Sequence, residues 1–102
     1  MATTDKRLCK GTLGNSNATL YTVPASTLAL VKAITVCNKT NVTVTFTITF
    51  ASTEVVHTHN LRAYDTLTIP FLDQILNAGE LIEGLASIAA SIDYYISGKE
   101  VT

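Results

Sequence analysis

The sequence has few charged residues and no excess of basic ones. Asp, Glu, Lys and Arg make up 15% of its 102 residues, against roughly 25% in a typical soluble domain. The formal net charge is −1. A nucleic-acid binder needs a basic patch that displaces counterions from phosphates. Lys6, Arg7 and Lys10 gather near the N-terminus, but three charges are more typical of a solvated first strand. We therefore expect no nucleic-acid partner.

Long apolar segments and cysteine-rich patterns are also missing. No run of 18 apolar residues occurs, so the sequence predicts no transmembrane helix and no membrane partner. Residues 1–17 lack the apolar segment of a secretory signal, which leads us to expect assembly in the cytoplasm of the producing cell. Cys9 and Cys37 are too few for a disulfide framework. A bridge between them stays an alternative, although a reducing compartment favours free thiols.

No recognisable catalytic motif is present. The sequence contains neither Gly-x-Ser-x-Gly nor a phosphate-binding glycine loop. A glycosidase needs two carboxylates about 5–9 Å apart in one cleft. The acidic residues are instead scattered, mostly beside turns, at Asp65, Asp73, Glu80, Glu83, Asp93 and Glu100. We expect a non-enzymatic protein with no catalytic residue and no cofactor.

Threonine is abundant, with 17 copies, and it marks the clearest strand. In Asn41–Phe50, Val, Phe and Ile alternate with Thr43, Thr45, Thr47 and Thr49. This period of two predicts a β-strand with one face in the core and the other covered by threonine. Leu28–Cys37 is richer in apolar residues and predicts a central strand. The short polar segment 38–41 between them is appropriate to a hairpin.

Further short strands are predicted on both sides of this pair. They are Leu8–Leu13 at an edge, Ala18–Val23 ending at Pro24, Glu54–His59, Thr66–Phe71 with Pro70 either placing it at an edge or ending it, and Ile92–Val101. Residues 1–4 are expected to form a flexible N-terminal arm. Residues 72–92 leave two alternatives open: apolar residues recur at helical spacing, but Gly79 and Gly84 interrupt it and equally favour strand, turn and strand.

Seven or eight short strands with frequent turn signals predict an all-β fold. We expect one domain, residues 1–102, that is an antiparallel β-sandwich of jelly-roll or immunoglobulin-like form; a small barrel has similar signals.

His57 and His59 are the one candidate metal site. Two residues apart on a strand, both imidazoles would point from the same face. Further ligands could come from symmetry in a trimer or from a cysteine. Ordinary strand histidines are the favoured interpretation, and we therefore predict no metal.

The tyrosines are candidates for contacts with other molecules. Tyr21, Tyr64, Tyr94 and Tyr95 could stack on carbohydrate or anchor an interface. Tyr94 and Tyr95 are adjacent, so on a strand they would face opposite sides.

Several segments together resemble a known group of proteins. They are Leu20–Ala25 (LYTVPA), Val31–Asn38 (VKAITVCN), the strand Val42–Phe50, Leu76–Glu80 (LNAGE) and Ile96–Glu100 (ISGKE). Their order is similar to that of small tailed-bacteriophage virion proteins of the capsid decoration, head-fibre and tail-accessory type. The resemblance implies a turn at Ala78–Glu80 and last strands at Leu81–Ser87 and Ile92–Ser97. A short helical turn is still expected at Leu72–Leu76.

The leading hypothesis is a structural component of a phage virion. Such a chain would decorate or cement the capsid, or attach to the tail, as a homotrimer or another symmetric oligomer assembled in the host cytoplasm. Its partners would be its own copies and a major capsid or tail protein. The alternative is adhesion to host-surface glycans or proteins through loops such as Gly14–Asn17.

Overall fold

Residues 2–102, which the computed structural model describes, form nine β-strands and contain no helix. The strands are β1 (Thr3–Thr12), β2 (Ala18–Thr22), β3 (Leu28–Asn38), β4 (Val44–Phe50), β5 (Thr53–Leu61), β6 (Thr66–Ile69), β7 (Gln74–Leu76), β8 (Leu81–Ala86) and β9 (Ile92–Val101). The all-β prediction is confirmed.

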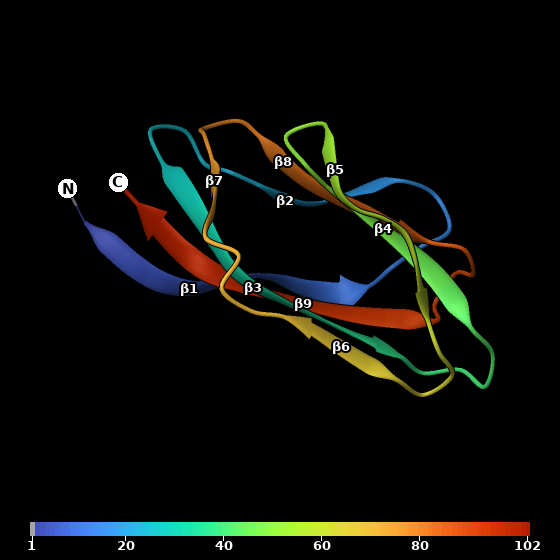
Figure 1. Cartoon of the computed structure of the whole chain (residues 1–102). Coiled ribbons are helices and arrows are strands. Elements are labelled where there is room, and N and C mark those ends of the chain that lie inside the picture. The colour runs from blue at the N-terminus through green and yellow to red at the C-terminus, as the bar shows by residue number, and fades with distance from the viewer. Residues whose placement is uncertain (1) are drawn as a thin grey trace.

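The strands form two antiparallel sheets that face each other as the layers of a sandwich (Figure 1). One sheet has the order β1-β9-β3-β6. The short β7 pairs with the same edge of β3 as β6, at the other end of that strand. The other has the order β2-β8-β4-β5. Successive strands from β1 to β4 alternate between the sheets. This strand order is that of a jelly roll, in which two Greek keys interleave, and it selects the first of the two predicted sandwich forms.

The alternating segment around β4 behaves as its pattern predicts. Val44, Phe46, Ile48 and Phe50 are buried between the sheets. The threonines between them face outward, and β4 lies in the interior of its sheet, between β8 and β5. Thr47 is only 8% exposed. Its hydroxyl accepts a hydrogen bond from the backbone N–H of Thr58 at 3.0 Å.

The predicted hairpin between β3 and β4 is wrong, because the two strands lie in different sheets. The buried side chain of Asn38 holds this crossing together. Its Nδ2 donates to the carbonyls of Val42 and Leu61 at 2.8 and 3.0 Å, and its Oδ1 accepts from the backbone N–H of Thr40. A short polar segment has the same composition in a hairpin and in a sheet-to-sheet crossing, so local sequence does not separate them.

The helical turn expected at Leu72–Leu76 is also wrong. Gln74–Leu76 pairs with β3 as the short strand β7. The N–H of Leu72 donates to the carbonyl of Lys32 at 2.9 Å. Leu76 is buried, whereas Ile75 is 60% exposed, which is the alternation of an extended chain. The edge of β3 offers these backbone groups partners that an isolated helical turn lacks.

The rest of residues 72–92 forms a turn and strands, which is the second of the two predicted alternatives. A turn at residues 77–80 includes Gly79 at φ +84°, a conformation that favours glycine. The side chain of Glu80 accepts a hydrogen bond from the N–H of Asn77 at 2.6 Å. The turn leads into β8, as the resemblance implies.

Both ends of the chain take part in the first sheet. Thr3 and Thr4 belong to β1 and pair with Val101 and Glu100 rather than forming a flexible arm. The backbone groups of Ala2 and Thr102 exchange hydrogen bonds of 2.9 and 2.8 Å. The chain ends therefore lie side by side (Figure 1). The ten-residue β9 offers β1 a partner along its whole length, which sequence periodicity does not reveal. The remaining residue of the predicted arm, Met1, lies outside the described residues.

Candidate functional site

A shallow depression of about 360 Å³ lies on the outer face of the β1-β9-β3 sheet. Its volume is near the lower end of the roughly 300–1,000 Å³ typical of small-molecule sites. The depression is lined by Lys10, Gly11, Thr12, Thr35, Cys37, Asp93, Tyr94 and Tyr95.

Strand register brings the outward-facing lining residues into two rows. Lys10 of β1, Tyr95 of β9 and Thr35 of β3 are neighbours across the sheet. Thr12, Asp93 and Cys37 form the next row on the same face. Side chains two residues apart share a face of a strand. Three segments that are distant in sequence therefore contribute to one surface.

Asp93 is held in place by two neighbours. Its Oδ1 accepts a hydrogen bond from the Thr12 hydroxyl at 2.6 Å and lies 3.2 Å from Lys39 Nζ. The Thr12 hydrogen bond, supported by Lys39 and opposed by partial desolvation, lowers the pKa of Asp93 below its usual 3.8. No residue in the range 2–102 forms a hydrogen bond with Oδ2 of Asp93. That oxygen is available as an acceptor.

Tyr95 borders the same depression. Its side chain remains 46% exposed. The guanidinium carbon of Arg7 lies 5.7 Å from the centre of the Tyr95 ring, a distance at which a cation is attracted to an aromatic face. Arg7 is not among the residues that line the depression. It restrains the ring, which nevertheless stays partly exposed.

Tyr94 faces the other way, as its position next to Tyr95 predicts. It packs against the hydrophobic core, and burial raises its pKa. A Cβ at position 11 would be 3.0 Å from the Tyr94 hydroxyl oxygen. Because Gly11 has no side chain, the Tyr94 ring can lie across β1.

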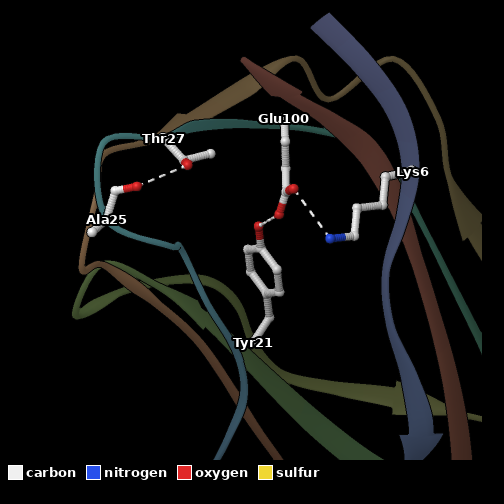
Figure 2. A network of polar contacts seen from close by, with 5 residues as sticks. All are labelled: Lys6, Tyr21, Ala25, Thr27 and Glu100. Atoms are coloured by element: carbon white, nitrogen blue, oxygen red, sulfur yellow. Dashed lines mark hydrogen bonds and ion pairs between the residues drawn. The ribbon is translucent and has the colours of Figure 1, made fainter. Parts of the chain in front are cut away.

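A second polar cluster joins the two sheets near the chain ends (Figure 2). The hydroxyl of Tyr21 donates a hydrogen bond to Glu100 Oε2, and Lys6 Nζ lies 3.1 Å from Glu100 Oε1. The Glu100 side chain is 13% exposed. The Tyr21 hydrogen bond, followed by Lys6 and opposed by desolvation, lowers the pKa of Glu100. Burial, followed by the charge and hydrogen bond of Glu100, raises the pKa of Tyr21. Both carboxylate oxygens are used within the protein, which identifies the cluster as a link between strands.

His57 and His59 do not share an environment, so the same-face prediction is wrong. Between the pairs Ile48–Val56 and Phe46–His59, β5 has two residues where β4 has one. This bulge interrupts the period of two. His57 is exposed and lies 2.5 Å from Glu54, whereas the ring of His59 meets Phe46 edge-on at 5.7 Å. Residues 2–102 contain no group of three His, Cys, Asp or Glu side chains placed to hold a metal ion.

Cys9 and Cys37 are free thiols, so the alternative of a bridge between them is wrong. Cys9 packs against the core, and burial raises its pKa from 9.0 to about 11. Cys37 lines the depression on the outer face. The sheet itself separates the two sulfur atoms.

The other acidic side chains mostly serve local structure. Asp65 accepts from the N–H of Thr66, Asp73 pairs with Lys32, and Glu83 accepts from Asn17. These contacts are typical of turns and strand ends. Sequence reasoning did not single out Asp93 among the acidic residues, since its position beside Thr12 depends on strand pairing.

Three large apolar side chains are exposed on β7 and in the segments that precede and follow β6. Phe71 is 89% exposed, Tyr64 is 71% exposed and Ile75 is 60% exposed. Tyr64 precedes β6, and Phe71 lies between β6 and β7. Phe71 and Tyr64 also have left-handed backbones, with φ of 58° and 57°. Sequence reasoning took Phe71 as the end of a strand and missed its exposure.

The comparisons with known proteins add no identity. No protein-family model and no curated protein matches the chain. Among residues 2–102 there is no helix long and apolar enough to cross a membrane.

Proposed function

We propose that this chain is a non-enzymatic structural subunit of a tailed-phage virion, which decorates or cements the capsid or attaches to the tail as a symmetric oligomer. The resemblance of five sequence segments to small virion proteins supports this role. The jelly-roll strand order is compatible with it, because capsid domains are among the proteins that use this fold. Jelly rolls also serve other functions, so the fold alone does not carry the proposal.

The exposed Phe71 carries the part of the proposal that concerns docking. A bulky residue in the left-handed region is unfavourable by about 1–2 kcal/mol. The Phe71 ring is 89% exposed, so little packing within the monomer offsets that strain. Strained backbone and exposed apolar groups concentrate where a protein contacts other molecules. We assign the docking contact to Phe71, Tyr64 and Ile75, which we call the β6–β7 edge.

The backbone of this edge adds to the argument. β6 and β7 pair with β3 on one side only. Their other sides present unpaired N–H and C=O groups, which can accept an added strand from a partner. Apolar anchors beside an open strand edge suit a coat or tail protein, or a neighbouring copy within a ring.

The test compares wild-type protein with Phe71→Asn in co-sedimentation with intact phage particles. Asn tolerates the left-handed backbone, so the variant should fold at least as well as wild type. We expect wild type to sediment with particles and Phe71→Asn to lose most of this binding. Val55→Asn is the matched control, because Val55 is a 42% exposed apolar residue on β5, in the other sheet.

Two results would count against the proposal. Equal sedimentation of wild type and Phe71→Asn would remove the β6–β7 edge as the contact. A wild-type chain that is strictly monomeric by light scattering and absent from purified virions would overturn the structural role itself.

A further inference from the structure

The depression on the outer face of β1, β9 and β3 combines an aromatic ring with a carboxylate that has one unused oxygen. We propose that it binds a saccharide unit, with a pyranose ring against Tyr95 and sugar hydroxyls donating to Asp93. This inference goes beyond the assembly role. It supplies a binding site for the alternative hypothesis of adhesion to glycans, on a face of the sheet and not on the loops at the end of the sandwich.

The chemistry of the two main residues matches that of a sugar. A pyranose ring has faces of C–H groups and a rim of hydroxyls. Tyr95 supplies an amphipathic ring, 46% exposed and restrained by Arg7. A restrained ring loses little freedom when a ligand binds, which favours affinity.

Asp93 supplies the polar contact. Thr12 and Lys39 both contact its Oδ1 and hold the carboxylate in one orientation. Oδ2 remains as an acceptor, and an ionised carboxylate accepts hydrogen bonds but donates none. Sugar hydroxyls are suitable donors. Lys10 and Thr35, in the neighbouring row, can donate to further hydroxyls.

Other ligand classes fit these groups less well. A wholly apolar ligand would cover Asp93 without a hydrogen-bond partner for Oδ2, which is unfavourable for a charged group. A phosphate or sulfate could pair with Lys10, but it would also be repelled by the ionised Asp93 in the same depression. The depression is also small enough for a single ring or a short saccharide rather than a protein surface.

The site is separate from the proposed docking edge. Tyr95 and Asp93 lie on β9, which pairs with β3 on the side opposite to β6 and β7. Changes at Tyr95 should therefore leave particle binding intact, and Phe71→Asn should leave sugar binding intact. Failure of one proposal is distinguishable from failure of the other.

Binding is tested in two ways with the full-length protein. An array of immobilised glycans surveys saccharide chemistry. Amide chemical shifts are followed by NMR during titration with galactose, glucose, mannose and N-acetylglucosamine. We expect a subset of these sugars to bind and to shift the amides of Thr12, Cys37, Asp93 and Tyr95. If no array glycan binds and no sugar shifts these amides, the proposal is wrong.

Variants separate stacking from charge. Tyr95→Ala should weaken binding at least tenfold, while Tyr95→Phe keeps the ring and should bind nearly as wild type. Asp93→Asn should weaken binding about tenfold or more, because hydrogen bonds to charged groups are the stronger class. Tyr64→Ala, at the other exposed tyrosine, is the control. Binding that survives in Tyr95→Ala, or that Tyr64→Ala abolishes equally, would overturn the assignment.

Cys37 provides an independent readout. It lines the depression, whereas Cys9 packs against the core. A sugar that saturates the shift changes should slow alkylation of Cys37 by iodoacetamide several-fold, with the Cys9→Ala variant used to isolate that signal. An unchanged Cys37 rate at saturation would place the sugar elsewhere and contradict the proposal.

Discussion

Tyr21 donates a hydrogen bond to Glu100 across the space between the two sheets (Figure 2). Tyr21 belongs to β2 in one sheet and Glu100 to β9 in the other. Lys6 of β1 completes the group through its ion pair with Glu100. The same carboxylate therefore links both sheets at the end where the chain begins and finishes.

Removal of the Tyr21 hydroxyl should weaken this link. We expect Tyr21→Phe to lower the free energy of unfolding by about 1.5 kcal/mol, the lower end of the range for hydrogen bonds to charged groups. Urea unfolding at neutral pH measures the change. Tyr64→Phe alters an exposed hydroxyl and should stay within about 0.5 kcal/mol of wild type. Equal losses in the two variants would mean that the link contributes nothing specific.

Stability should fall in acid because of Glu100 and Asp93. Both carboxyls have folded-state pKa values below their usual values of 4.5 and 3.8. A lowered folded-state pKa stabilises the fold above the unfolded-state value, and this contribution is lost as pH falls through the folded-state value. Urea unfolding between neutral pH and pH 3 should show the decline. In Glu100→Gln the free energy of unfolding should decline less steeply below about pH 4.5 than it does in wild type. An unchanged decline would argue against this role of Glu100.

Stability should also fall in alkali because of Cys9. Burial raises the pKa of its thiol from 9.0 to about 11 in the folded state. Between these values the unfolded chain releases a proton that the folded chain retains, so rising pH favours unfolding. Cys9→Ala should flatten the fall in stability between pH 9 and pH 11. Cys37→Ala is the control for removing a thiol outside the core, and a decline in Cys9→Ala as steep as in wild type would contradict this role of Cys9.

Gly98 should tolerate no side chain. A Cβ at this position would lie 2.0 Å from the carbonyl oxygen of Leu30, so the backbones of β9 and β3 would have to separate. We expect Gly98→Ala to destabilise the protein by about 3 kcal/mol or more. Gly14 has open space around it, and Gly14→Ala should change the free energy of unfolding by less than about 0.5 kcal/mol. Thermal and urea unfolding of the pair give the comparison.

Substitution of Thr58 should relieve the backbone strain at the bulge in β5. Its φ is +46°, which is unfavourable for a β-branched side chain. Asn accepts this region more readily, so Thr58→Asn should stabilise the protein by about 1 kcal/mol. The hydrogen bond from the Thr58 N–H to Thr47 is a backbone donation and is retained. Thr45→Asn, in a regular part of β4, should be destabilising or neutral. A loss of stability in Thr58→Asn would show that its side chain makes a compensating contact.

Local pattern predicted most strands but not their partners. The alternation in β4 was decisive, since burying one face of an extended chain requires apolar residues at every second position. Pro70 correctly indicated an edge, because β6 pairs only with β3. Leu72, Ile75 and Leu76 have helical spacing, but so few residues are equally compatible with an extended chain. The segment pairs with β3 as the short strand β7. The Asn38 crossing was mistaken for a hairpin for a similar reason.

The sequence by itself determined that this chain is built of strands, because period-two burial and threonine-rich faces are local properties. Tertiary structure alone decided which sheet each strand joins, and hence that the sandwich is a jelly roll. It also separated His57 from His59 through a bulge in β5 opposite Thr47, which exists only in the pairing of β5 with β4. In the same way, only strand register brings Lys10 and Thr35 to the ring of Tyr95. Backbone pairing acts between residues distant along the chain, so no local period records it.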